Sequence, residues 1–73
     1  MNFAERLKFA RKKMGLTQEK LAKLARIDSV LICKFEANVR MPSLDTFRKL
    51  ALGLRVSADY LLDINIKELW EAE

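Results

Sequence analysis

The stretch that most constrains the fold is residues 17–36, TQEKLAKLARIDSVLICKFE, because it contains two short helical patterns in quick succession. Thr17 and Asp28 are favourable N-cap residues, since their side-chain oxygens can accept hydrogen bonds from the unpaired N–H groups of a first helical turn. The pattern predicts one helix over about 18–25, a tight turn, and a second helix over about 29–37.

The apolar residues of these two helices are spaced so that they can pack against each other. Residues three or four apart share one face of a helix. The inward set is Leu21, Ala22, Ala25, Ile32 and Phe35. Ile27 lies in the turn and can fill the space between the helices. Two helices held at a steep angle form a helix-turn-helix, and its second helix can enter a DNA major groove.

Length and composition limit the class of protein. A chain of 73 residues with 51% hydrophobic residues is expected to form one domain with a packed core. One cysteine and no histidine exclude an internal disulfide and a Cys/His metal cluster, and a lone thiol fits a reducing cytoplasm. The N-terminus lacks the apolar segment of a signal peptide, and no apolar run approaches the length of a membrane span.

The charge is unevenly distributed. Residues 63–73 hold one lysine and four carboxylates, a net charge of −3. Because the whole chain carries +4, the other 62 residues carry +7. A basic body is compatible with an anionic partner such as nucleic acid, but it is equally compatible with a soluble, lysine-rich surface.

The remaining chain predicts further short helices and no strand. A first helix spans Phe3 to Met14, capped by Asn2 and ended by Gly15. Ser43 caps a fourth helix that ends at Gly53 or within the next few residues, and Ser57 caps a fifth. The inward residues of these helices are expected to be Phe3, Leu7, Ala10 and Met14, then Leu44, Phe47, Leu50 and Ala51, then Tyr60, Leu61 and Leu62. The fold class is therefore all-α, with five helices around one core.

The last residues form a segment of their own. We assign residues 1–62 to the helix-turn-helix domain and residues 63–73 to a C-terminal extension with a short helical portion. The extension is apolar at Ile64, Ile66, Leu69 and Trp70. Apolar surface of this kind on a terminal segment is expected to be covered by another part of the molecule or by another chain. It either folds back on the body, toward Phe3 or Phe9, or makes a dimer contact with a second subunit.

The order of these features resembles the Cro/repressor-type, or XRE-like, helix-turn-helix family. The matching segments are RKKMGLTQ, TQEKLA, ICKFE, MPSLDTFRKLA and LRVSADYLL, which extend from about Leu7 to Leu62. The resemblance implies a compact, five-helix, lambda-repressor-like DNA-binding domain whose partner is double-stranded DNA.

The resemblance also implies roles for matched residues outside the second helix of the motif. Arg11 and Glu36 are expected to form the family's buried structural ion pair. Gln18 is expected to contact a DNA phosphate together with Thr17, in keeping with the attraction of helix N-termini for phosphate. Arg40, in the loop after the motif, is a further phosphate-contact candidate.

The expected base-contact residues are Ser29, Val30, Cys33 and Lys34, the outward positions of the second helix. Lys34 can donate to guanine, Val30 can meet a thymine methyl group, and Cys33 can pack against a base or sugar. Hydrogen-bond donors on this face are few, because Val30, Leu31 and Cys33 are apolar where many relatives carry polar residues. Specificity then comes partly from DNA shape and methyl contacts, or the face binds protein. Leu31 can also pack at the edge of the core.

Two arginines depart from the family pattern. Arg26 and Arg55 occupy positions where relatives often carry glycine. Arg26 therefore adopts either a right-handed backbone or a left-handed one, the latter strained by about 1 kcal/mol.

The leading functional prediction is a sequence-specific transcriptional regulator, a repressor, acting as a cytoplasmic homodimer on DNA. The alternative is a protein-interaction module, such as an antitoxin-like or anti-repressor-like partner with the same fold. We expect no enzyme activity, since the chain lacks histidine, a Gly-rich phosphate loop and a base beside its one cysteine. We expect no metal, cofactor or small-molecule ligand either.

Overall fold

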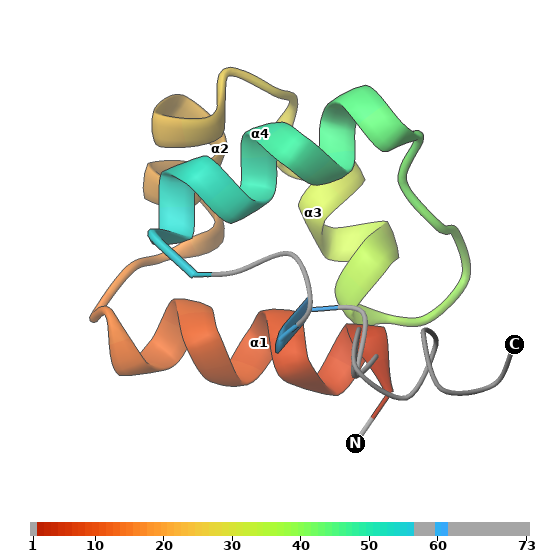
Figure 1. Cartoon of the computed structure of the whole chain (residues 1–73), viewed down its shortest axis with the longest axis horizontal. Coiled ribbons are helices and arrows are strands. Elements are labelled where there is room, and N and C mark those ends of the chain that lie inside the picture. Colours follow the sequence, from red (N-terminus) through yellow and green to blue (C-terminus); the bar gives the residue numbers. More distant parts are fainter. Residues whose placement is uncertain (1, 57–59, 62–73) are drawn as a thin grey trace, which may run out of the picture.

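The computed structural model describes residues 2–56, 60 and 61. Within them the chain forms four helices and no strand: α1 (Phe3–Lys13), α2 (Gln18–Ala25), α3 (Ser29–Glu36) and α4 (Leu44–Leu54). The all-α prediction is confirmed (Figure 1). These are four of the five expected helices, and Tyr60 and Leu61 of the proposed fifth are themselves helical. Of the proposed fifth helix only Tyr60 and Leu61 are described, and Ser57, Leu62 and the extension at 63–73 lie outside the described residues.

Four of the five predicted N-caps are confirmed, and the fifth, Ser57, lies outside the described residues. Asn2, Thr17, Asp28 and Ser43 each accept a hydrogen bond from a backbone N–H of the following turn. Asn2 and Glu5 exchange two such bonds and complete a capping box. Each cap satisfies donors that the helix itself leaves unpaired.

Left-handed residues end the helices or follow directly on their ends. Gly15 (φ 71°) adopts this conformation after α1, as expected, and Asn38 (φ 61°) adopts it after α3. Arg26 (φ 58°) and Arg55 (φ 56°) adopt it too, so the strained alternative is the one that occurs. The next residue in each case, Ile27 or Val56, donates its N–H to the carbonyl five positions earlier and packs against the core. This Schellman closure offsets the backbone strain.

The core lies between all four helices. Its fully buried side chains are Leu7, Leu21, Ile32, Phe35, Leu50, Leu54 and Leu61. Phe3 joins α1 to two other helices, because its ring lies 6.4 Å from that of Phe35 and 5.9 Å from that of Phe47. The half-buried Ile27 packs on this core from the turn after α2, as expected, and Leu16 packs on it from the turn before α2.

Two predicted core residues are exposed instead. Leu44, 84% exposed, is the first residue of α4, and helical side chains lean toward the N-terminus, so it projects past the start of the helix. Met14, 48% exposed, follows the last turn of α1, where the chain turns at Gly15. The sequence reading missed Leu54, which is buried at the other end of α4.

Gly53 does not end α4 but allows it to approach α2 closely. A Cβ atom at this position would lie 3.4 Å from the Cβ atom of Ala25. The small residue therefore sets the spacing between α4 and the first helix of the motif, and α4 continues to Leu54.

Candidate nucleic-acid interface

α3 is fixed on one side by the core and is free on the other. Ile32 and Phe35 are almost fully buried, and the Asp28 carboxylate accepts a hydrogen bond of 2.9 Å from the Val30 N–H. On the opposite side Cys33 and Lys34 are exposed, and Val30 is 56% exposed. The helix thus presents a surface strip to solvent while its inner face is held.

The predicted base-contact residues occupy that strip, with one difference in degree. Ser29 is half-buried at the start of α3, whereas Val30, Cys33 and Lys34 are exposed. Leu31 is half-buried and packs against the core, so it belongs to the edge of the core rather than to the strip. The strip therefore offers one cation, one methyl-bearing side chain, one thiol and one hydroxyl.

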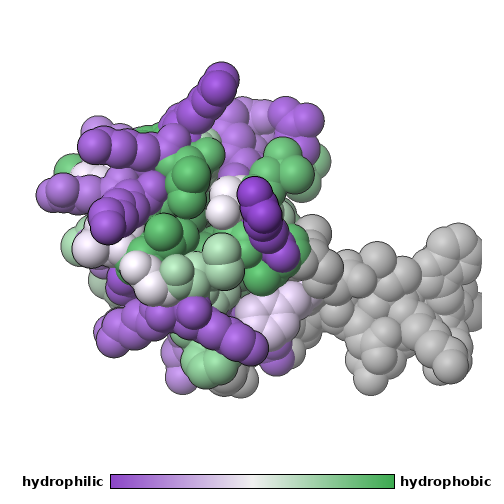
Figure 2. All heavy atoms as spheres, turned by 90° about the vertical axis from the view of Figure 1, so that its left-hand side faces the viewer, coloured by the Kyte–Doolittle hydropathy of each residue, from purple (hydrophilic) through white to green (hydrophobic). Residues whose placement is uncertain are grey.

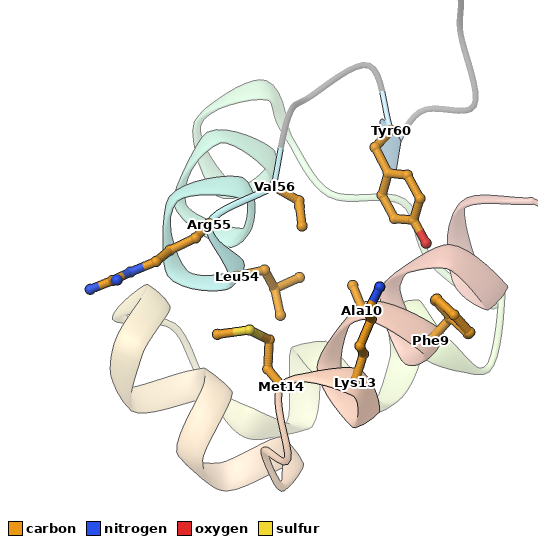
Figure 3. Close-up of a pocket in the computed structure, with 8 residues that line it drawn as sticks. All are labelled: Phe9, Ala10, Lys13, Met14, Leu54, Arg55, Val56 and Tyr60. Carbon is orange, nitrogen blue, oxygen red and sulfur yellow. The ribbon is translucent and has the colours of Figure 1, made fainter.

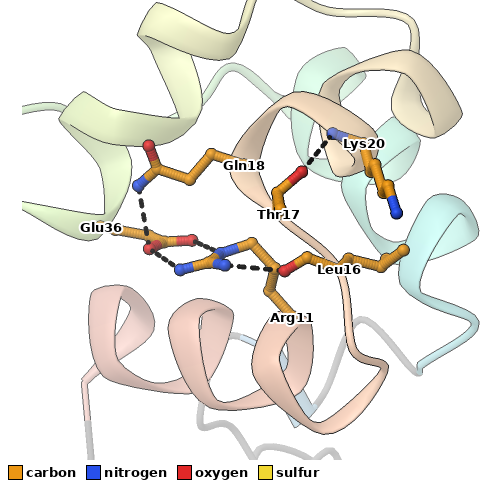
Figure 4. A network of polar contacts seen from close by, with 6 residues as sticks. All are labelled: Arg11, Leu16, Thr17, Gln18, Lys20 and Glu36. Carbon is orange, nitrogen blue, oxygen red and sulfur yellow. Dashed lines mark hydrogen bonds and ion pairs between the residues drawn. The ribbon is translucent and has the colours of Figure 1, made fainter.

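A polar junction ties α1, α2 and α3 together (Figure 4). Arg11 donates from Nε to Glu36 Oε2 at 2.6 Å and from its Nη2 to Glu36 Oε1 at 2.9 Å. It also donates from its Nη1 to the Leu16 carbonyl at 2.8 Å, and Gln18 donates its amide to Glu36 Oε1 at 3.2 Å. We call these four residues the Arg11 junction. The expected Arg11–Glu36 ion pair is thus present.

The surroundings of Arg11 in this junction favour its charged form. The side-chain hydrogen bond to Glu36, and then its negative charge, raise the pKa of the Arg11 guanidinium above its ordinary value, although burial lowers it. The Arg11 side chain is 10% exposed and that of Glu36 is 5% exposed, so water screens the pair little. Every described buried side-chain nitrogen and oxygen has a hydrogen-bond partner.

The start of α2 lies beside this junction. The Thr17 hydroxyl oxygen accepts from the Lys20 N–H at 3.1 Å, which leaves its own O–H to donate elsewhere. Because Gln18 is held through Glu36, its side chain connects the start of α2 to the end of α3. The N-terminal end of α2 therefore has a fixed position relative to the surface strip of α3.

A basic hollow adjoins the strip, and the sequence reading missed its lysines. Lys8 and Lys12 of α1 line a hollow of about 370 Å³ together with Gln18 and Cys33. The i, i+4 spacing of these lysines, on the same side of α1 as Arg11, is the signal that could have identified them. They bring two exposed positive charges next to α3.

The other predicted site residues are not brought into this cluster. Arg40 is exposed in the connection between α3 and α4 and is not among the residues that line the hollow. Ile64, Ile66, Leu69 and Trp70, predicted either to fold back on the body or to make a dimer contact, lie outside the described residues.

Among the described residues, no helix is both long and apolar enough to cross a membrane. Nowhere in this part of the chain do three or more His, Cys, Asp or Glu side chains gather where they could hold a metal ion.

Comparisons with known proteins agree with this geometry. Residues 4–65 match a family model described as a helix-turn-helix domain. Over 62 residues the chain is 40% identical to the HTH-type transcriptional regulator ImmR of Bacillus subtilis (strain 168). That match covers 85% of this chain and 49% of ImmR, so the chain spans about half the length of this curated relative.

Solved structures show the same arrangement. The restriction-modification controller protein C.AhdI of Aeromonas hydrophila superposes with a TM-score of 0.79 at 35% identity, covering 82% of this chain and 91% of that one. The P22 c2 repressor, solved in complex with a synthetic operator, superposes with a TM-score of 0.83 at 29% identity. Here the coverage is 89% of this chain and 98% of the repressor.

Proposed function

Because the chain belongs to the helix-turn-helix domain family, we propose that it is a sequence-specific DNA-binding transcriptional regulator, a repressor, whose α3 enters the major groove. The observation that carries the proposal is the two-sidedness of α3. Ile32 and Phe35 anchor it in the core, while Val30 and Lys34 remain accessible. The P22 c2 repressor, of similar fold, was solved with operator DNA.

The base contacts are assigned to the exposed strip. Lys34 donates to guanine O6 or N7, and Val30 contacts the methyl group of thymine. Ser29, at the first turn, bonds to a base edge or a phosphate oxygen, and Cys33 packs against a base or sugar. With one long donor on the strip, much of the selectivity comes from methyl contacts and from the shape of the duplex.

The phosphate contacts surround the strip. Thr17 and Gln18 contribute through the start of α2, where the helix dipole favours an anion. Arg40 contributes from the connection after α3. The basic hollow extends this set to Lys8 and Lys12, which stand beside Gln18. Phosphate contacts position the protein without reading sequence.

The proposal includes the assembly and the setting of the protein. We place the DNA-binding domain at residues 1–62 and treat residues 63–73 as an extension. The regulator acts in the cytoplasm as a homodimer on a two-fold-related site, since a module of this size buries little interface alone. It performs no catalysis and takes no cofactor.

The test begins with selection of bound sequences from random DNA, followed by titration of the selected site at several salt concentrations. We expect a tight site and an affinity that falls steeply with salt, because phosphate contacts release counterions. Failure to select any tight site, or an affinity that salt does not change, contradicts the proposal.

Matched lysine variants then test the phosphate set. Lys8→Gln with Lys12→Gln should reduce the steepness of the salt dependence by roughly 1–2 units while leaving the preferred sequence unchanged. Lys13→Gln with Lys23→Gln is the control, because it removes the same number of charges at two exposed lysines that do not line the hollow. Equal effects of the two sets would show that only net charge matters.

A second candidate function is a protein-interaction module that uses the same fold. It is favoured by the apolar character of the strip, where Val30 is 56% exposed beside Cys33. Ser29→Ala and Lys34→Ala discriminate the two functions. A loss of selectivity on the selected DNA supports the regulator, and unchanged DNA binding favours the protein partner.

A further inference from the structure

A second hollow is lined by other residues of α1 than the basic one, and the two hollows share no lining residue (Figure 3). It has a volume of about 610 Å³ and runs between the C-terminal halves of α1 and α4. Phe9 and Met14 line it from α1, Leu54 and Val56 from α4 and the residues after it, and Tyr60 from near the end of the described chain. We call this hollow the α1–α4 groove.

The groove leaves large apolar side chains in water. Phe9 is 51% exposed and Met14 is 48% exposed, although both lie beside buried core residues. Figure 2 shows hydrophobic side chains gathered on the end of the molecule that carries the last turns of α1 and α4, with hydrophilic side chains around them. A contiguous apolar hollow with a polar border is the usual form of a docking site.

We propose that the α1–α4 groove is covered by the chain's own C-terminal extension, with Leu69 and Trp70 as the side chains that enter it. The extension has the matching composition, because Ile64, Ile66, Leu69 and Trp70 are apolar within an otherwise polar segment. Burial of an aromatic and an aliphatic side chain against Phe9 and Met14 removes apolar surface of both partners from water.

Charge complementarity favours the extension as the segment that occupies this groove. The charged residues that line the groove are both cations, Lys13 and Arg55. The extension carries Asp63, Glu68, Glu71 and Glu73 against Lys67. The other apolar hollow on α4, which is lined by Leu44 and Leu52, contains Asp45 beside Arg48 and so lacks this complementarity. An acidic, apolar segment is therefore better matched by the α1–α4 groove.

The length of the extension allows it to dock within the same molecule. Tyr60 lines the groove and Leu61 is buried in the core, so the extension starts beside its own docking site. Nine residues lead from Leu61 to Trp70, which is about 14 Å of helix or about 30 Å of extended chain. A short tether gives an effective concentration in the millimolar range, above that of a second copy at ordinary protein concentrations.

The chain provides its own reporter, since Trp70 is its single tryptophan. We expect its fluorescence in the full chain to be blue-shifted and shielded from acrylamide, relative to the guanidinium-unfolded chain. Phe9→Ser with Met14→Ser should return the emission to that of a water-exposed indole. The control is Leu24→Ser with Leu52→Ser, which changes two exposed apolar residues outside the groove and should leave the emission unchanged.

A charge variant keeps the test valid if the double serine variant fails to fold. Lys13→Glu alters a residue exposed at the border and should make Trp70 more accessible to acrylamide, whereas Lys23→Glu on α2 should not. Circular dichroism verifies that each variant retains its helices. Equal quenching in the two charge variants would contradict the proposed contact with the groove.

Concentration distinguishes the chain's own extension from that of a second copy. Shielding that stays constant from about 1 µM to about 100 µM, with sedimentation showing monomer at the lower end, supports docking within one molecule. Shielding that appears only as dimer forms assigns the groove to a second subunit and overturns the proposal. A fully water-exposed Trp70 in the unmodified chain overturns it as well.

Discussion

The Arg11 junction and the start of α4 contain the same pairing of charges in two different settings. At the junction the Arg11 and Glu36 side chains are 10% and 5% exposed and lie 2.6 Å apart. On α4 the Arg48 and Asp45 side chains are 70% and 59% exposed at 3.0 Å, and Lys49 lies 3.3 Å from the same carboxylate. Distance alone makes the two regions look alike, whereas burial separates them.

The difference shows that the effect of an ion pair on stability depends on how deeply it is buried. An exposed pair is screened by water and salt and is worth between nothing and about 1 kcal/mol. A buried pair adds little over a well-packed apolar pair, but removing one partner leaves a desolvated charge without compensation. The junction is therefore sensitive to single substitutions, and the start of α4 is tolerant of them.

The largest effect should come from Glu36→Ala. It leaves the Arg11 guanidinium buried without its carboxylate, so we expect the free energy of unfolding to fall by about 3–5 kcal/mol. That is a large share of the roughly 5–15 kcal/mol typical of a native domain. Urea denaturation followed by circular dichroism measures it. A loss below about 1 kcal/mol would place the junction in the same class as the exposed pair.

A smaller loss is expected for Arg11→Lys, which retains the charge. Lysine cannot reproduce the fork that serves both Glu36 oxygens and the Leu16 carbonyl. We expect a loss of about 2 kcal/mol in the same denaturation experiment. If the variant is as stable as the original chain, charge rather than geometry holds the junction together.

Gln18→Ala should have a still smaller effect on stability. It removes one hydrogen bond of 3.2 Å from a carboxylate that keeps both bonds to Arg11. We expect a loss of about 1 kcal/mol. A thermal melt of this variant beside Glu36→Ala gives the ranking, and an equal loss in both would mean that Gln18 is as necessary as the ion pair.

Asp45→Asn should be nearly silent at neutral pH. Hydrogen bonds from Arg48 and then Lys49 lower the pKa of Asp45 below its ordinary value of 3.8, so any stabilisation is present above that value and is lost as the pH falls through the lowered pKa. Because Asp45 is exposed and water and salt screen its contacts with Arg48 and Lys49, the contribution that is lost is small, and thermal melts from about pH 5 to pH 8 should nearly overlay those of the original chain. A clear drop in the midpoint would contradict the contrast between the two regions.

The sequence predicted the parts of the fold that depend on neighbouring residues. Thr17 and Asp28 can be predicted as caps because the backbone N–H groups that they bind lie only two or three residues further along the chain. Leu44 was misplaced because helical spacing tells which face a residue shares, not how far along the core it lies. The left-handed backbone at Arg26 and Arg55 depends on the packing of Ile27 and Val56, which spacing alone does not report.

The candidate interface divides in the same way. The exposed strip follows from the burial of Ile32 and Phe35, which helical periodicity predicts. The basic hollow cannot be predicted from helical periodicity, because it forms only where α1 and α3 are brought together from distant parts of the chain. The roles of Ser29, Val30, Cys33, Lys34, Thr17, Gln18 and Arg40 toward DNA stay predictions.

Glu36, at the last turn of α3, receives donors from α1 and α2 at once. A helix fastened at its end to both of its neighbours cannot tilt or slide on its own. Its ordering is completed when the chain folds, so little conformational entropy remains to be lost on meeting a ligand. DNA that binds this helix must therefore change its own shape to fit. The protein will favour deformable duplex sequences over stiff ones for that reason.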